Sequence, residues 1–317
     1  MNQTVTAFVM IGLKHLGNVR IIFFIILMII FIFIIIGNLS TSVVILMNKH
    51  LHAPMYILIG FLSILELACA TVSLPGILSI ISMGSTYIST KHCFAQMYLL
   101  HCLGITENFL LNIMAFDRYV AICRPLQYHA IMTTKVCIML VSCCWILGIL
   151  CPLPVLILVS ELPFCGSFEI HHILCDSSPV LGLACADTTI IHTTDLAVGL
   201  GVILITSVFI LMVYIKIIAT IMKMRHVKER KKAFSSCISH FAVVLIFYSS
   251  VAFMYIVLHG DFSAEYEEAV AINYYTLTPL FNPIIYSFRN KEIKKSLNEL
   301  FKGVTSTRNF SFSPKIM

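Results

Sequence analysis

Asp117, Arg118 and Tyr119 place an acid, a base and a phenol side by side where a long apolar stretch ends. Charged side chains are costly in hydrocarbon and common at a membrane–water boundary. The run therefore marks the end of a membrane helix, and it brings ionic and hydrogen-bonding groups to that boundary.

A second polar group lies deeper, within the apolar stretches. Asn38, Glu66 and Glu107 each lie eleven residues from the predicted cytosolic boundary of their own stretch. At the rise of an α-helix this is about 16 Å, so the three side chains share one depth near the membrane centre. Two carboxyl groups at one depth either share a proton or hold a cation between them. The alternative is that each carboxyl is neutral and hydrogen-bonded to a neighbouring helix.

Two further sets of polar residues lie within the apolar stretches. His101 and Cys102 resemble a pair of metal ligands, but adjacent helical residues point roughly 100° apart, so His101 is expected to line a pocket instead. Pro279 and Pro283 each remove a helix hydrogen bond and favour a kink. With Asn282 between them, this segment is predicted to be a moving part.

The elements that position these residues are membrane helices. The chain has 317 residues, of which 59% are hydrophobic and 11% charged, against about 25% charged in an ordinary globular protein. Seven apolar stretches are each long enough to cross about 30 Å of hydrocarbon as a helix. These stretches are Ile21–Met47, Met55–Ser82, Cys93–Phe116, Val136–Ser160, Asp195–Met222, Ser236–His259 and Ala269–Phe288. The predicted fold class is an all-α membrane protein, a seven-transmembrane helix bundle.

The charge distribution predicts the orientation. Lys and Arg gather in the connectors after the first, third and fifth stretches and in the C-terminal tail, whereas acidic residues dominate the opposite loops. By the positive-inside rule, residues 1–20 form an extracellular tail, 21–288 the membrane domain and 289–317 a cytosolic segment. The net charge of +6 is a topology signal, and no nucleic-acid partner is expected. Asn2 begins a glycosylation sequon on the outer side.

The last segment has the pattern of an amphipathic helix. Ile293, Leu297, Leu300 and Phe301 recur at helical spacing with lysines on the other face. This predicts a short eighth helix along the inner leaflet. No nucleotide-binding loop, catalytic triad or zinc-enzyme spacing occurs, so an enzyme is not predicted.

Four of the twelve cysteines fall on the predicted outer side. Four cysteines in an oxidising compartment allow three disulfide pairings, and the sequence does not choose among them. A metal site with the neighbouring His171 and His172 is the competing interpretation. The four are Cys93, Cys165, Cys175 and Cys185.

Four local runs, together with the Asp117-Arg118-Tyr119 helix end, resemble vertebrate olfactory receptors of the tetrapod-type class, within the rhodopsin-like G-protein-coupled receptors. The runs are Leu51–Tyr56, Met114–Cys123, Lys232–His240 and Pro279–Asn290. They occur in the family's order and cover the cytosolic helix ends. The resemblance implies an odorant receptor in the plasma membrane, expressed in the ciliary membrane of sensory neurons. It also implies a heterotrimeric G protein of the stimulatory, olfactory type that raises cyclic AMP.

The resemblance further implies roles for individual residues. Arg118 would be held by Asp117 at rest and released toward the G protein, with Tyr214 and Tyr286 closing over it. Disulfides would join Cys93 to Cys175 and Cys165 to Cys185. Glu66 and Glu107 fall where the family can hold a sodium ion; no other cofactor is expected. Residues implied for coupling and activation are Asp117, Arg118, Tyr119, Tyr214, Asn282, Pro283 and Tyr286.

A ligand pocket is predicted by helical periodicity outward from Arg118. It is expected to take a small, neutral, semi-volatile molecule between mostly apolar walls, hydrogen-bonded by His101 or Tyr255. Packing of the helices against one another is the alternative role for each residue. The predicted lining is Leu100, His101, Gly104, Ile105, Asn108, Val198, Val202, Tyr248, Val251, Ala252, Tyr255, Ile272 and Tyr275.

Two other functions fit some of these residues. A secondary transporter also uses intramembrane carboxyl groups and broken helices, but the internal repeats typical of transporters are not evident. A receptor for an amine or peptide is the closer alternative. Aminergic receptors use an acid in the outer half of the third helix, and Leu100 and His101 occupy that level here.

Overall fold

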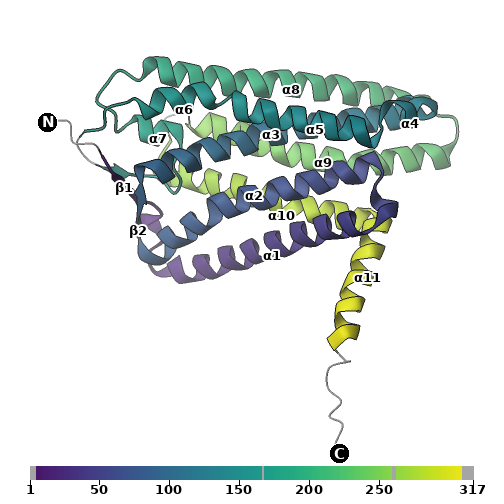
Figure 1. Cartoon of the computed structure of the whole chain (residues 1–317), viewed down its shortest axis with the longest axis horizontal. Helices are drawn as coiled ribbons and strands as arrows, with labels where there is room; N and C mark the ends of the chain where they lie inside the picture. Colours follow the sequence, from purple (N-terminus) through teal and green to yellow (C-terminus); the bar gives the residue numbers. More distant parts are fainter. Residues whose placement is uncertain (1–4, 166–167, 259–261, 309–317) are drawn as a thin grey trace, which may run out of the picture.

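The computed structural model describes residues 5–165, 168–258 and 262–308. Helices make up most of this part of the chain, in the order in which Figure 1 labels them. The main helices are α1 (Arg20–Met47), α2 (Pro54–Met83), α3 (Thr90–Cys123), α5 (Thr134–Leu150), α6 (Leu153–Ser160), α8 (Thr189–Lys223), α9 (Val227–Leu258), α10 (Ala264–Arg289) and α11 (Lys291–Arg308). Shorter elements are the helices α4 (Tyr128–Ile131) and α7 (Ser177–Leu181), and 3₁₀ turns at Lys14–Val19, Lys49–Leu51 and Pro125–Gln127.

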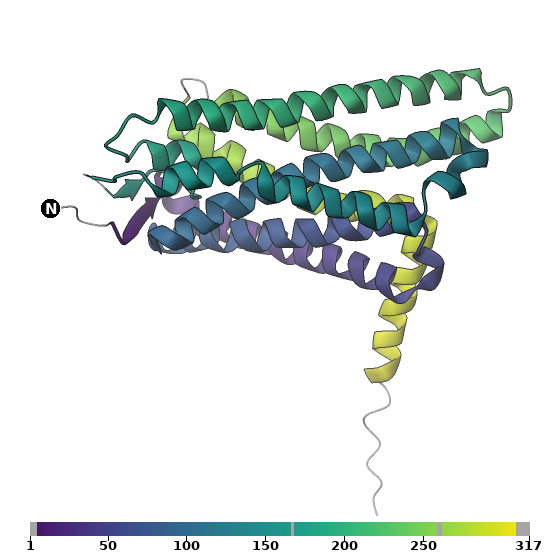
Figure 2. The same cartoon turned by 45° about the horizontal axis from the view of Figure 1, so that its top comes forward.

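The long helices run alongside one another as a bundle (Figures 1 and 2). α3 is its central helix, because it packs against α2, α5, α8 and α9. α10 closes the bundle by packing against α9, α1 and α2. With α5 and α6 taken as one interrupted span, seven helical spans of the described chain form the bundle, as predicted.

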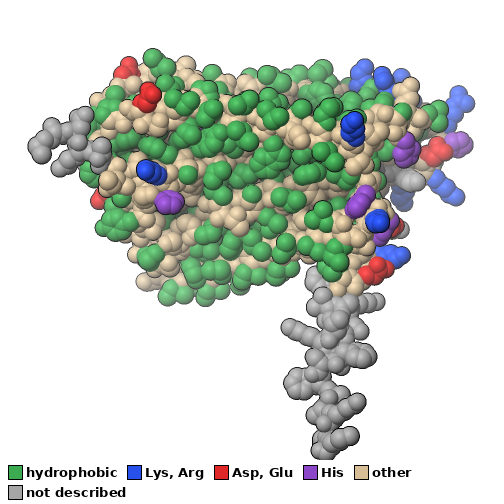
Figure 3. Space-filling model, viewed as in Figure 1, with side chains coloured by type: hydrophobic (Ala, Val, Ile, Leu, Met, Phe, Trp, Pro, Cys, Tyr) green, Lys and Arg blue, Asp and Glu red, His purple; other side chains and the backbone are tan. Residues whose placement is uncertain are grey.

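The outer surface of the bundle is apolar. Among the described residues, six helical segments are long and apolar enough to cross a membrane, and the most apolar window of the first is only 11% buried within the protein. Figure 3 shows hydrophobic side chains over the middle of the visible face, with Lys and Arg gathered at one end. α10 falls outside those six; it carries Glu265, Glu267 and Glu268 near its start and packs inside the bundle. The protein is a multi-pass membrane protein.

Local sequence signals set several helix ends. Ser89 and Thr133 accept hydrogen bonds from backbone N–H groups three residues ahead, as N-caps do. Gly84 ends α2 at φ 88°, a left-handed conformation that favours glycine. Pro152 separates α5 from α6, because proline cannot donate the next helix hydrogen bond.

A small sheet at one end of the bundle was not predicted. β1 (Ala7–Ile11) pairs antiparallel with β2 (Ser85–Ser89) and parallel with β3 (Glu169–Ile170), so the strand order is β2-β1-β3. Phe8 and Met10 alternate into the core, which gives β1 the period of two of a half-buried strand. We call this the sheet end of the bundle, and the opposite end, with Asp117 and Arg118, the Arg118 end.

Helix boundaries differ from the predicted spans at both ends of the bundle, and the largest difference is at the Arg118 end. α9 begins at Val227, nine residues before the predicted Ser236, because its charged first turns continue the helix beyond the apolar stretch. α11 runs across the long axis of the bundle (Figures 1 and 2). Such a direction fits a helix along a membrane surface. The predicted span end His259 and the sequon residue Asn2 lie outside the described residues.

Candidate functional site

A cavity of about 140 Å³ lies toward the sheet end, lined by residues of α3, α7, α8, α9 and α10. Its walls are mostly apolar, as in small-molecule sites. Nine predicted residues line it: Leu100, His101, Gly104, Ile105, Asn108, Val202, Val251, Tyr255 and Tyr275.

Four predicted lining residues lie elsewhere. Ala252 is exposed on the outer face of α9, and Ile272 is buried in the helix core. Gly199 lines the cavity in place of Val198, because adjacent residues of a helix point about 100° apart. Tyr248 accepts a hydrogen bond of 3.3 Å from Asn112, away from the cavity lining. The assignments of Ala252 and Val198 were wrong in helical phase. Tyr248 shares a helix face with Val251 and Tyr255, but it lies one turn beyond the cavity lining.

Sequence reasoning missed eleven lining residues. Some continue a helical face that periodicity could have found, such as Asp195 and Gly199, which lie seven and three residues before the predicted Val202. The loop residues had no such signal, because nothing in their spacing shows that the loop folds inward. The missed residues are Asp176, Ser177, Ser178, Leu181, His192, Asp195, Leu196, Gly199, Ile203, Met254 and Tyr274.

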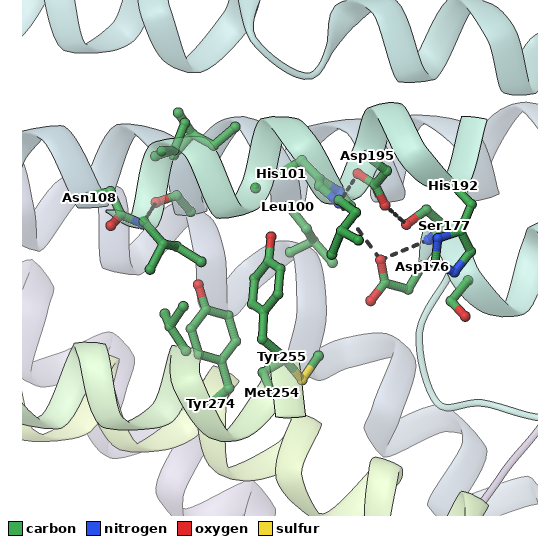
Figure 4. Close-up of a pocket in the computed structure, with 18 of the residues that line it drawn as sticks. Leu100, His101, Asn108, Asp176, Ser177, His192, Asp195, Met254, Tyr255 and Tyr274 are labelled. Atoms are coloured by element: carbon green, nitrogen blue, oxygen red, sulfur yellow. Dashed lines mark hydrogen bonds and ion pairs between the residues drawn. The ribbon is translucent and has the colours of Figure 1, made fainter. Parts of the chain in front are cut away.

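His101 is the main polar group of the cavity, and its orientation is set by the backbone. Its Nδ1 donates to the carbonyl oxygen of Met97 at 2.8 Å. Its Nε2 therefore faces the carboxylates of Asp176, at 3.9 Å, and Asp195, at 3.7 Å (Figure 4). The predicted hydrogen-bonding histidine thus lies in the cavity, with two acids beside it.

Ser177 ties these two acids together. Its backbone N–H donates to Asp176 at 2.8 Å, and its hydroxyl donates to Asp195 of α8. The Cys175 N–H donates to Gln96 of α3 at 3.1 Å. These hydrogen bonds hold the loop before α8 over the cavity.

Two disulfides hold this loop. Cys93 of α3 is bonded to Cys175, and Cys165 to Cys185, the pairing that the resemblance implied. The first closes a sequence separation of 82 residues and the second one of 20. His171 and His172 take no part in a metal cluster among the described residues.

A polar layer lies midway along the bundle. Asn282 donates to one oxygen of Glu66, and the carboxyl groups of Glu66 and Glu107 are close enough to interact. One oxygen each of Asn38, Glu66 and Glu107 is buried with no hydrogen-bond partner in the described part of the chain. These oxygens are acceptors, so they fit a hard cation such as sodium or added protons.

Asn38 also compensates for a proline inside α10. Pro283 has no N–H, so the carbonyl of Pro279, one helical turn earlier, has lost its usual donor. The Asn38 amide donates to that carbonyl at 2.8 Å. A polar side chain from α1 therefore satisfies the backbone group that Pro283 leaves without a donor in α10, as membrane helices with internal proline require.

The Arg118 end holds a second cavity, of about 640 Å³. Arg118 is bonded to Asp117, and both are buried. The Tyr128 hydroxyl donates to Asp117 at 2.9 Å. Burial, then the nearby Asp117 carboxylate, raise the pKa of Tyr128, so this hydroxyl stays protonated and able to donate.

The tyrosines predicted to close over Arg118 lie near enough to interact with its charge, and Tyr214 also has another partner. Tyr214 shares a hydrogen bond of 2.6 Å with His240, and the two rings stack. Tyr286 lines the cavity, and its buried hydroxyl has no hydrogen-bond partner among the described residues. Tyr119 lies beside Arg118, partly buried and stacked on Phe116. The bonds to Tyr128 and His240 were not anticipated, because each joins two different elements and depends on how those elements pack.

Comparison with known proteins identifies the family. The profile of the family described as "Olfactory receptor" matches residues 27–303. Human olfactory receptor 6N1 is 41% identical over 300 residues, covering 95% of this chain and 96% of its own length. Human olfactory receptor 6K6 is 42% identical over 301 residues, with 95% and 88% covered. Human olfactory receptor 6Q1 is 40% identical over 299 residues, with 94% of each chain covered. The chain belongs to the olfactory receptor family, whose members are G-protein-coupled receptors and not enzymes.

Proposed function

We propose that this odorant receptor binds a small, mostly apolar, semi-volatile molecule in the cavity at the sheet end and activates a stimulatory, olfactory-type G protein. The observation that supports this most is the pair of cavities at opposite ends of α3. His101 lines one and Arg118 the other, so a single central helix connects ligand to output.

The ligand class follows from the size and lining of the sheet-end cavity. An apolar cavity of about 150 Å³ holds one benzene molecule, so a volume of about 140 Å³ suits a compact odorant. His101 and Tyr255 supply polar anchors beside apolar side chains such as Leu100, Ile105 and Val202. One or two hydrogen bonds would orient such a ligand without demanding a charge on it.

The G-protein side is proposed from the Arg118 end. Its cavity is large enough for side chains of a partner, and Arg118, Lys228 and Lys231 give it positive charge. Release of Arg118 from Asp117 would present the guanidinium to the G protein. The expected output is a rise in cyclic AMP.

The same proposal includes the setting in the membrane. The cluster of Lys and Arg at the Arg118 end supports a cytosolic location for it by the positive-inside rule (Figure 3). The sheet end and N-terminus would then face outward, in the plasma membrane of sensory cilia. A sodium ion held by Glu66 and Glu107 would lie between the two cavities.

The test is an odorant panel applied to cells that express the chain and a cyclic AMP reporter. The wild-type chain is expected to respond to some apolar, semi-volatile members. His101→Phe and Tyr255→Phe should each change the response profile, whereas Ala252→Val, on the outer face of α9, should not. If both cavity variants kept the wild-type profile, the pocket assignment would be wrong.

A further inference from the structure

Two glycines face tyrosine hydroxyl groups across the sheet-end cavity. Gly199 of α8 lies against the Tyr255 hydroxyl of α9, and Gly104 of α3 lies against the Tyr274 hydroxyl of α10. All four residues line the cavity. Figure 4 shows both tyrosine rings directed away from the helices that carry them and across the cavity.

The contact at Gly199 leaves no room for a side chain. A Cβ atom there would overlap the Tyr255 hydroxyl, and it would lie 2.7 Å from the ring carbon that bears this hydroxyl. At Gly104 a Cβ would lie 3.2 Å from the Tyr274 hydroxyl, which is tight but not overlapping. Glycine within a helix costs about 0.5–1 kcal/mol relative to alanine, so the space it leaves at Gly199 has a structural use.

We propose that Gly199 is a specificity-determining residue, which sets the size of the ligand cavity by receiving the Tyr255 hydroxyl. This inference rests on the proposed odorant site. With a methyl group at position 199, the tyrosine must move, and the open space beside it is the cavity that it already lines. The ring then occupies volume that the ligand would use, so larger ligands are excluded first.

Gly104 also lies against a tyrosine hydroxyl, that of Tyr274, but the contact is less close than that of Gly199 with Tyr255. Because the neighbour must yield by only a few tenths of an ångström, alanine there should reduce the cavity less than alanine at Gly199. Gly201 is the matched control, since it lies in the same helix and a Cβ atom there would meet nothing within 4 Å among the described residues. Alanine at Gly201 changes helix propensity without filling any space.

The test compares ligand size limits across variants of the purified full-length receptor. The probes are cyclic ketones of increasing ring size, from cyclopentanone to cyclododecanone, and binding is measured as the rise in melting temperature. Gly199→Ala should weaken binding of the largest accepted ketone by about 10- to 200-fold, the range for one methylene in an apolar pocket. Gly104→Ala should weaken it less, and Gly201→Ala should match the wild type.

The decisive comparison measures Gly199→Ala in a receptor that also carries Tyr255→Phe. That second substitution removes the hydroxyl that position 199 receives. Gly199→Ala should then cost clearly less in affinity, and less in melting temperature without ligand, than it does beside tyrosine. An equal penalty in both backgrounds, or Gly199→Ala behaving like Gly201→Ala, would overturn the inference. A receptor that binds the ketones with these size limits but raises no cyclic AMP would contradict the proposed signalling alone. A receptor stabilised by none of them would contradict the site and the inference together.

Discussion

Side-chain hydrogen bonds hold both ends of the bundle, but the sheet end has disulfide and sheet bonds in addition. At the sheet end, two disulfides and a three-stranded sheet fix the loop above the cavity. At the Arg118 end, side-chain hydrogen bonds and one ion pair hold Arg118, Tyr128 and Tyr214 in place. Covalent and backbone bonds persist, whereas side-chain bonds exchange readily.

The two cavities also differ, in size and in the charge of their lining residues. The one at the sheet end is small and mostly apolar, and it includes none of the Lys or Arg residues of the described chain. The one at the Arg118 end is larger, and its described lining carries Arg118, Lys228 and Lys231 with a single acid, Asp117. Under the proposed function, the sheet-end cavity would be a preformed ligand site, and the Arg118 end would be a surface that rearranges for a protein partner.

Loss of the Cys93–Cys175 disulfide should have the largest effect on stability. By the loop-entropy relation, a separation of 82 residues corresponds to about 4.5 kcal/mol, and the 20 residues between Cys165 and Cys185 to about 3.3 kcal/mol. Cys93→Ala with Cys175→Ala should therefore lower the melting temperature of purified receptor more than Cys165→Ala with Cys185→Ala. The reverse order would show that the sheet end does not depend mainly on its tether to α3.

Replacement of Arg118 should affect the other end. Arg118→Ala leaves the Asp117 carboxylate buried without its cation, at a cost of about 3–5 kcal/mol. It should also abolish the cyclic AMP response to odorant. The double variant Asp117→Asn with Arg118→Ala removes both charges and should recover surface expression but not signalling. Signalling by the double variant would contradict the role given to Arg118.

Removal of the Tyr128 hydroxyl should have a moderate effect. Its hydrogen bond to the charged Asp117 is of a kind worth about 1.5–3 kcal/mol. Tyr128→Phe should weaken the resting arrangement and raise basal cyclic AMP severalfold without odorant. Tyr87→Phe, at an exposed position of the sheet end, is the control and should leave basal signalling unchanged. Unchanged basal signalling in both variants would show that the bond does not restrain the Arg118 end.

Sodium, whose proposed site lies between the two ends, should have the smallest effect on stability. At ten times its Kd, a bound ion stabilises the folded state by about 1.4 kcal/mol. The wild-type receptor should melt at a higher temperature in sodium chloride than in choline chloride. Glu107→Gln, which removes an acceptor charge from the layer, should remove this difference. A salt difference that persists in Glu107→Gln would argue against the ion site.

The sequence predicted what depends on composition and on local motifs. Apolar length gave the bundle, and the run around Arg118 marked the helix end that the structure places beside a cavity. Rotation of each helix about its axis was less predictable, since tertiary packing decides it: Ala252 points outward while Met254 lines the cavity. The inward fold of Asp176 was also missed, because its position depends on a distant disulfide and not on local pattern.

The central claim is that a ligand near His101 controls the Arg118 end. The most direct test is whether binding of the G protein at one end changes odorant affinity at the other. Odorant affinity should be measured on purified receptor with and without the stimulatory G protein. If the two ends are coupled, the G protein raises odorant affinity by about 5- to 150-fold, and Arg118→Ala abolishes this increase. An odorant affinity that is the same with and without the G protein would contradict coupling between the two ends.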